Sequence, residues 1–151
     1  MEYLHTMIRI KNIDESLDFF CNKMSLVETH RIHNKNGRFT LIYLAAYPKE
    51  VKTRGLTAPL LELTYNWPDT EGKVEEYNSG RNFGHIAFGV DNIYETCQSL
   101  MDKGVTINRP PKDGNMAFIK SPDGISIEFL QKGTALKPSE PWISMKNTGT
   151  W

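Results

Sequence analysis

The phrase HTMIRIKNIDES, residues 5–16, returns with variations as HIAFGVDNIYET, residues 85–96. Each copy opens with a histidine and continues in an alternating pattern that is typical of a strand. An Asn follows, with Glu three positions later, and this spacing is that of a capping box at the start of a helix. The sequence therefore predicts a strand and a helix in each copy. A repeat on this scale indicates two similar modules.

Each predicted helix is followed by strand-forming segments. In the first half these are residues 26–33, 38–45 and 59–65, and in the second half they are 105–108, 116–120 and 125–130. The order β-α-β-β-β thus occurs twice, which predicts an α+β fold of two paired βαβββ modules. We expect the first module over residues 1–66, a polar linker over 67–82, the second module over 83–131 and a tail over 132–151.

The tail shows no helical or strand period, but it carries Trp142 and Trp151. Disordered segments seldom contain aromatic residues. We therefore expect these two side chains to pin the tail onto a partner surface.

The composition narrows the class of protein. With 151 residues, 18 of them basic and 18 acidic, the chain has the size of one ordinary domain and no net charge. This balance argues against a nucleic acid or an anionic membrane as partner. No apolar run approaches the roughly 18 residues that span a bilayer, and the first residues lack the pattern of a signal peptide. Cys21 and Cys97 lie in helix-like apolar patterns without CxxC spacing, which indicates buried thiols in a reducing compartment, so we expect a cytoplasmic protein.

Two glutamates stand in the middle of predicted apolar strands, Glu62 in LLELT and Glu128 in ISIEFL. A buried charge is costly unless it is paired or bound to a metal. Each module offers one histidine on its first strand and one glutamate on its last, so a pseudo-twofold axis would bring together His5, Glu62, His85 and Glu128. Imidazole and carboxylate suit zinc, nickel, cobalt or iron, and two carboxylates neutralise a dication. A core histidine, or a glutamate paired with a nearby arginine, explains one such residue more simply, but the repetition favours a metal site.

The motifs HTMIR, LLELTYNW, FGHIAF and SPDG-ISIE occur in this order over residues 1–131. In these motifs the chain resembles the glyoxalase I (lactoylglutathione lyase) family of the vicinal-oxygen-chelate superfamily. The resemblance implies paired βαβββ modules in a homodimer with composite sites at its interface. It also implies one divalent metal per site, nickel or zinc first and cobalt next, at the positions of His5, Glu62, His85 and Glu128. In bacterial members the ligands of one module typically meet those of the other module from the second chain.

The activity that this resemblance implies is isomerisation of the hemithioacetal of methylglyoxal and glutathione to S-lactoylglutathione. A proton moves between neighbouring carbons through an enediolate, and a carboxylate near the metal carries it. By resemblance Glu128 is the expected base, while Glu62 re-delivers the proton or serves the other epimer. Arg9 and Asn66 are expected to hold the γ-glutamyl end of glutathione, and Arg81 its glycyl carboxylate.

Some positions depart from the family pattern. Ser126 stands where some relatives carry an aromatic residue, so either Trp67 or the tail supplies the aromatic group, or the pocket is more open. The polar stretch 49–58 is an insertion relative to short bacterial relatives. His30 and His33 are three apart on a strand and point to opposite faces, so we assign them no function.

Other functions fit the same modules. An acyl-CoA epimerase would use similar proton chemistry, although TYNW together with Arg9 favours glutathione. An extradiol dioxygenase uses two histidines and one carboxylate, so Glu62 argues against it. A non-catalytic metabolite- or drug-binding protein of this fold has no need of all four ligands.

Overall fold

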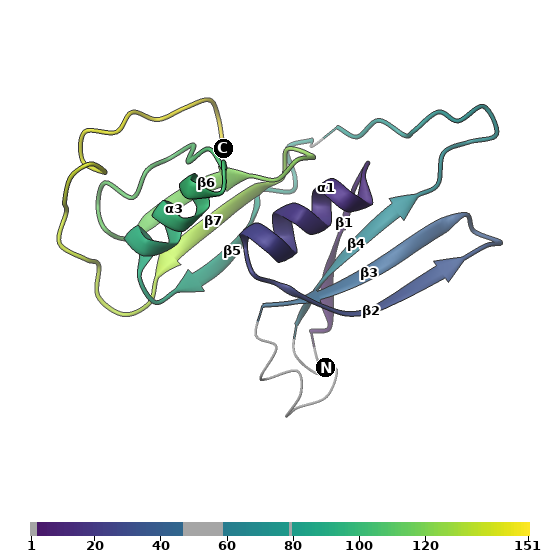
Figure 1. Cartoon of the computed structure of the whole chain (residues 1–151), viewed down its shortest axis with the longest axis horizontal. Helices are drawn as coiled ribbons and strands as arrows, with labels where there is room; N and C mark the ends of the chain where they lie inside the picture. Colours follow the sequence, from purple (N-terminus) through teal and green to yellow (C-terminus); the bar gives the residue numbers. More distant parts are fainter. Residues whose placement is uncertain (1–2, 47–58, 79) are drawn as a thin grey trace. The chain divides into compact units, whose positions relative to one another are not determined.

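The protein contains two compact units, residues 1–78 and 79–151, each built from a small sheet and a helix (Figure 1). The computed structural model describes residues 3–46, 59–78 and 80–151. The fold is α+β, as the sequence predicts. The predicted insertion at 49–58 lies outside the described residues. In the described part of the chain, none of the helices has the length and apolar character needed to span a membrane.

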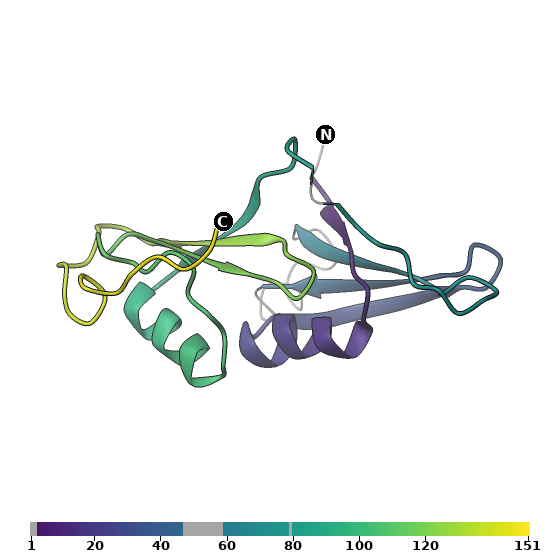
Figure 2. The ribbon, with the colours of Figure 1, turned by 90° about the horizontal axis from the view of Figure 1, so that it is seen from above.

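The first unit follows the predicted β-α-β-β-β order. Its elements are β1 (His5–Arg9), α1 (Ile13–Leu17) continued by a π-helical segment (Asp18–Lys23), β2 (Val27–Asn34), β3 (Phe39–Ala45) and β4 (Leu60–Asn66). The strands are arranged β1-β4-β3-β2, with β1 parallel to β4 and the other pairs antiparallel. The helix covers one face of this sheet (Figure 2). Alternate strand residues such as Ile8, Ile42 and Leu63 are buried there, so the other face remains free for polar side chains.

The second unit is a shorter version of the same pattern, with β5 (His85–Val90), α3 (Ile93–Asp102), β6 (Met116–Lys120) and β7 (Ser126–Gln131). Its sheet has the order β5-β7-β6, with β5 parallel to β7. The prediction of a strand at 105–108 is wrong, because these residues form no strand and the pairing nearby is an isolated bridge between Arg109 and Phe118. Pro110 and Pro111 follow this bridge and have no N–H to donate, so they do not extend the pairing beyond Arg109.

Both helices begin at the predicted caps. The Asn12 side chain accepts a hydrogen bond from the backbone N–H of Glu15 at 3.1 Å. Asn92 accepts from the N–H groups of Tyr94 and Glu95 at 3.1 and 3.2 Å. These bonds satisfy amides that have no partner within the first helical turn, so the repeated phrase fixes the point where each helix starts.

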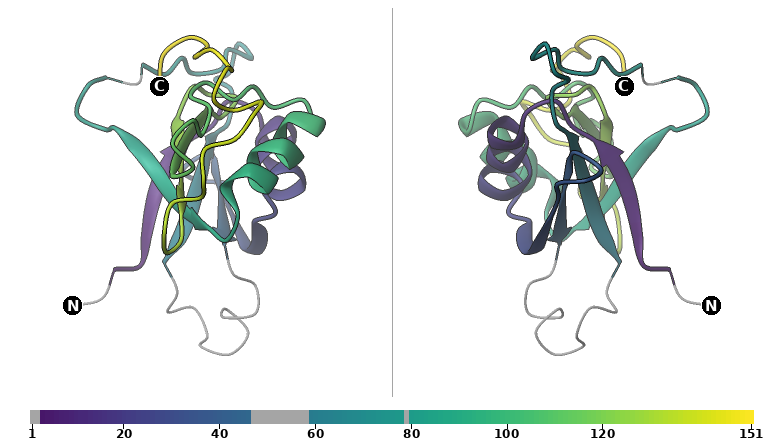
Figure 3. Two further views of the ribbon diagram at one scale, coloured as in Figure 1. Left: turned by 90° about the vertical axis from the view of Figure 1, so that its left-hand side faces the viewer. Right: turned by 90° about the vertical axis from the view of Figure 1, so that its right-hand side faces the viewer.

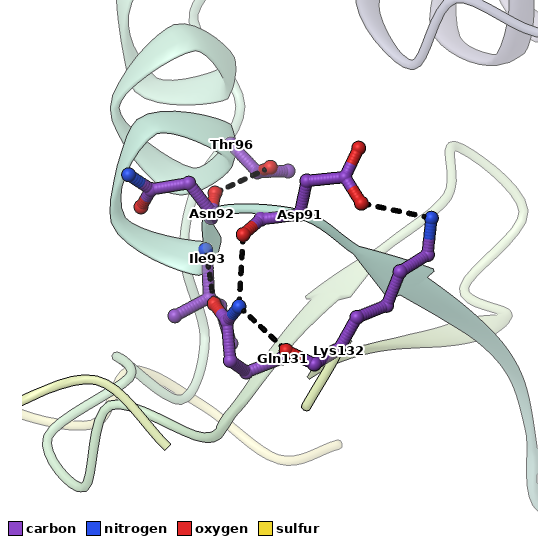
Figure 4. A network of polar contacts seen from close by, with 6 residues as sticks. All are labelled: Asp91, Asn92, Ile93, Thr96, Gln131 and Lys132. Atoms are coloured by element: carbon purple, nitrogen blue, oxygen red, sulfur yellow. Dashed lines mark hydrogen bonds and ion pairs between the residues drawn. The ribbon is translucent and has the colours of Figure 1, made fainter. Parts of the chain in front are cut away.

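A polar network joins the start of α3 to the end of β7 (Figure 4). The Gln131 side chain accepts a hydrogen bond from the Ile93 N–H at 2.9 Å and donates to the carbonyls of Asp91 and Lys132 at 2.8 and 3.0 Å. Lys132 also forms an ion pair with Asp91 at 3.0 Å. Because Gln131 is buried, these bonds hold the helix start against the strand that carries Glu128.

The C-terminal tail is ordered on its own unit, where it loops beside α3 and returns toward β6 (yellow in Figures 1 and 3). Trp142 is 4% exposed and stacks on Tyr94, with ring centroids 6.0 Å apart. Thr148 and Asn108 exchange backbone and side-chain hydrogen bonds of 2.8 and 2.9 Å. The expectation that Trp142 pins the tail to a partner is therefore wrong, because Tyr94 of the same chain already provides its apolar contact.

Replacing Gln131 by Leu should lower the free energy of unfolding by about 2 kcal/mol, because it leaves the buried Ile93 N–H without an acceptor. Chemical denaturation of the full chain measures this change. Gln98→Leu is the matched control, since Gln98 is exposed on α3 and its loss should cost about 0.5 kcal/mol or less. Equal effects of the two substitutions would contradict the structural role of Gln131.

Candidate metal-binding and catalytic site

The parallel pairing of β1 with β4 brings a histidine and a glutamate together in the first unit. Met7 is the register partner of Glu62, and His5 lies two residues before Met7 on the same face. His5 Nε2 and Glu62 Oε2 are 3.0 Å apart, with the carboxylate buried and the imidazole side chain 39% exposed. The pair is therefore open to solvent on the histidine side only.

The second unit repeats this arrangement. Ala87 is the register partner of Glu128, and His85 again lies two residues earlier on the same face. His85 Nε2 and Glu128 Oε2 are 3.1 Å apart, with side-chain exposures of 43% and 12%. The same strand pairing, offset and distance thus occur in both units.

These two pairs offer donors that suit a divalent metal. In the residues that the structure describes, no group of three or more His, Cys, Asp or Glu side chains is close enough to hold an ion. Each unit by itself supplies one imidazole and one carboxylate, which is half of a four-ligand set. Two neutral imidazoles and two carboxylates would match the charge of a dication and the ligand preference of zinc, nickel or cobalt.

An aromatic ring faces each pair from the neighbouring strand. Tyr43 on β3 is the register partner of Glu62, and Phe118 on β6 is the register partner of Glu128. The rings of His5 and Tyr43 meet edge to face with centroids 5.8 Å apart, and those of His85 and Phe118 meet in the same way at 5.4 Å. No pattern in the sequence marks these two aromatic residues, because their position beside the glutamates follows only from the strand register.

The two carboxylates differ in their hydroxyl neighbours. Burial raises the pKa of Tyr43, and so do its hydrogen bond to Glu62 and the negative charge of that carboxylate. Thr64 Oγ1 donates a second hydrogen bond to Glu62 Oε1 at 3.3 Å. At the corresponding positions beside Glu128 stand Phe118 and Leu130, which have no hydroxyl group. Glu62 is thus fixed by side chains that Glu128 lacks.

Arg9 and Asn66 extend the polar face of the first sheet. Arg9 lies four residues after His5 and Asn66 four residues after Glu62, so both share the face of the His5–Glu62 pair. Asn66 Nδ2 donates to Glu75 Oε2 at 2.7 Å. Burial and Glu75 raise the pKa of Tyr77, while the Arg9 charge and a hydrogen bond with Asn66 oppose that rise. The two predicted substrate-binding residues therefore lie in one cluster with an acid and a phenol.

Arg81 precedes β5 and lines a pocket of the second unit that also contains Lys120, Ser126 and Trp151. This pocket adjoins His85, because His85 and Ser126 are register partners. The sequence suggested Trp67 or the tail as the source of an aromatic group near Ser126. Trp67 donates its indole N–H to Thr40 at 2.9 Å in the first unit, whereas Trp151 lines the same pocket as Ser126.

The other two histidines lie on opposite faces of the first sheet. His30 stacks on Tyr43, with centroids 4.2 Å apart and rings nearly parallel at 7°. His33 Nδ1 is 3.0 Å from the hydroxyl of Thr40, on the face that packs toward the helix. His30 therefore buttresses the aromatic ring beside Glu62, a role that its sequence position did not indicate.

The family follows from comparison with known proteins. The family model described as the glyoxalase/bleomycin resistance protein/dioxygenase superfamily matches residues 3–129. A lactoylglutathione lyase of Neisseria meningitidis serogroup A is 40% identical over 137 residues, which cover 87% of this chain and 91% of that protein. The chain belongs to the glyoxalase I family. A probable lactoylglutathione lyase of Synechocystis is 38% identical over 136 residues, covering 87% of this chain and 95% of that protein.

Solved structures agree with this family. The trypanothione-dependent glyoxalase I of Leishmania major superposes with a TM-score of 0.75 at 30% identity, covering 87% of each chain. Membership of the glyoxalase I family confirms the resemblance seen in the sequence motifs. The match of the family model ends at residue 129, so the whole tail, residues 132–151, lies beyond it.

Proposed function

We propose that this protein is a lactoylglutathione lyase, which isomerises the hemithioacetal of a 2-oxoaldehyde and glutathione to a thioester of a 2-hydroxy acid. The observation that carries the proposal is the repeated His–Glu pair, with Nε2–Oε2 distances of 3.0 and 3.1 Å. Family membership supports the same activity. In the proposed homodimer, the pair of one module meets the other module's pair from the partner chain.

The four residues His5, Glu62, His85 and Glu128 would hold one divalent ion per site, with nickel or zinc as the first candidates and cobalt as the third. Such an ion, when bound, stabilises negative charge that develops on substrate oxygens and orients them. The two carboxylates neutralise the dication, which lowers the cost of burying it. The imidazoles are half-exposed and accessible for this role.

Glu128 carries the proton in the proposed reaction. Its carboxylate takes a proton from the carbon that bears sulfur, and the electron pair left behind forms the enediolate. The neighbouring carbon then receives the proton back, while the hydroxyl proton moves from the oxygen of the first carbon to that of the second. No atom or electron leaves the substrate, so an isomerisation results. Glu128 suits this role because Phe118 and Leu130 offer it no hydroxyl group, whereas Tyr43 and Thr64 fix Glu62. Supporting hydrogen bonds orient a metal ligand, so the hydroxyl groups around Glu62 suit a carboxylate that holds the metal.

The thiol part of the substrate is an anionic tripeptide. We assign its γ-glutamyl end to Arg9 and Asn66, since a guanidinium binds a carboxylate through two hydrogen bonds. Glu75, which accepts from Asn66, would then face the ammonium group of the same end. Arg81 is assigned to the glycyl carboxylate.

Removing bound metal with a chelator should abolish thioester formation from methylglyoxal and glutathione, and reloading with Ni²⁺, Zn²⁺ or Co²⁺ should restore it. Ultraviolet absorbance of the thioester follows the reaction, and elemental analysis of untreated protein names the native ion. Inactivity with every ion, together with epimerisation of an acyl-CoA substrate, would replace the proposed function by the epimerase alternative.

Replacing Glu128 by Gln should lower kcat by about 100-fold or more, because a positioned base contributes at least that much, while the affinity for metal falls by a smaller factor. Glu62→Gln should show the opposite balance, with the larger loss in metal affinity. Turnover kinetics and chelator competition measure the two effects, and Glu95→Gln on exposed α3 serves as the control. Equal losses of turnover and metal affinity in Glu128→Gln would refute its role as base.

Replacing Tyr43 by Phe should weaken metal binding by about tenfold, since it removes the hydroxyl that holds Glu62 but keeps the ring. Tyr65→Phe is the matched control, because Tyr65 lies on the same sheet but on the opposite face from Glu62. Dissociation constants for Zn²⁺ from chelator competition provide the comparison. If both variants bind Zn²⁺ as tightly as the unmodified protein, Tyr43 does not position Glu62.

A further inference from the structure

The strand β2 contains one extra residue at the point where it passes Tyr43. The pairing of β2 with β3 shifts at Thr29, which is the extra residue of a β-bulge, and His30 is then the register partner of Tyr43. In a regular strand Thr29 would stand opposite Tyr43, and His30 would point to the helix face. Because Tyr43 is also the register partner of Glu62, the bulge places His30 on the face that carries the Glu62 carboxylate.

Two contacts attach His30 to the neighbouring strand. Its imidazole stacks on the ring of Tyr43, with centroids 4.2 Å apart and an interplanar angle of 7°. Thr29 Oγ1 donates to the Tyr43 carbonyl at 3.1 Å and lies 3.0 Å from His30 Nδ1. A threonine hydroxyl has a single hydrogen, so while that hydrogen is on the carbonyl, His30 Nδ1 must donate. The bulge residue therefore orients the imidazole as well as placing it.

The ring of Tyr43 is held from two directions. His30 covers its face, and the ring of His5 meets it edge to face with centroids 5.8 Å apart. The phenol hydroxyl is hydrogen-bonded to Glu62. A tyrosine side chain turns about two bonds, and contacts with its ring restrict both rotations. His30 thus acts on Glu62 at one remove, since Tyr43 lies between them in the strand register.

The second unit has no such arrangement in the part of the chain that the structure describes. Phe118 stands beside Glu128 where Tyr43 stands beside Glu62. On its other side Phe118 pairs with Arg109 in an isolated bridge, so neither a strand nor an imidazole corresponds to β2 and its histidine. A phenylalanine ring has no hydroxyl group to direct at a carboxylate. The stack is therefore a device of the first unit.

We propose that His30 is a positioning residue of the metal site, whose stack on Tyr43 keeps the phenol hydroxyl on Glu62 and so gives the metal a fixed carboxylate. This inference rests on the proposed function, and it assigns a role to a residue that lies beyond the four ligands. Hydrogen bonds to a ligating carboxylate raise the affinity for metal, because they orient the ligand before the ion arrives. The effect of His30 on the metal must then depend on the Tyr43 hydroxyl.

The Kd for Zn²⁺, measured by chelator competition on the full chain, tests this dependence. His30→Ala should weaken binding about fivefold, and His30→Phe, which keeps a flat ring for the stack, should remain within about twofold of the unmodified protein. In a Tyr43→Phe background His30→Ala should change the Kd less than about twofold, because the hydroxyl is already absent. His33→Ala is the matched control, since His33 lies on the same strand and the opposite face.

Equal weakening by His30→Phe and His30→Ala would show that the imidazole itself binds the ion, and it would overturn the inference. An unchanged effect of His30→Ala in the Tyr43→Phe background would overturn it as well, because the histidine would then act without the hydroxyl. Retention of Zn²⁺ affinity in His30→Ala would have the same meaning.

Urea denaturation in the presence of a chelator separates this inference from the proposed function, because it needs no metal. Tyr43→Phe should lower the urea midpoint, since it removes the hydrogen bond to Glu62. In a His30→Ala background that shift should fall by about half or more, because the released ring no longer keeps its hydroxyl on the carboxylate. Such coupling would support the positioning of Glu62 even if no ion restores turnover. Equal shifts in the two backgrounds would overturn it even if turnover is normal.

Discussion

A carboxylate buried in the middle of an apolar strand is the constraint on which the rest of this protein depends. Glu62 and Glu128 are both buried, and a charge in that position requires a partner. The parallel pairing of the first and last strands in each unit supplies this partner. It places each histidine opposite the residue that lies two positions before the glutamate, on the same face of the sheet. A parallel pair requires a crossover connection, and in each unit this connection contains a helix, which in the first unit covers the opposite face of the sheet. The topology that creates each pair therefore also leaves its face open.

Duplication alone would give two carboxylates with equivalent surroundings. In this chain the surroundings differ. Tyr43 on β3 and Thr64 on β4 hold Glu62 through hydroxyl groups, whereas Phe118 and Leu130 occupy the equivalent positions near Glu128 and have no hydroxyl group. The proposed division of work between the two glutamates rests on this difference. The His–Glu pairs are preserved between the units, and their surroundings have diverged.

The sequence predicted those features that depend on local pattern. The capping boxes at Asn12 and Asn92 located the helix starts, and the paired histidines and mid-strand glutamates marked the residues that the structure brings together within each unit. The strand predicted at 105–108 is absent, because the pairing in this region is reduced to one bridge at Arg109, which two prolines follow. The sequence does not indicate the contact between Tyr43 and Glu62, because that contact depends on the register between β3 and β4. The metal, the dimer and the roles of the four ligands remain predictions.

The tail could not have been placed from its sequence, because it follows no period and its contacts are made one residue at a time. Trp142 fixes its path by stacking on Tyr94, and Trp151 reaches Phe118 beside His85. Strand residues near the pairs are constrained by register, since moving one side chain to the other face would also move a histidine or a glutamate. A tail anchored outside the sheet is free of that constraint. It can change the surface beside His85 while the histidines and glutamates keep their geometry.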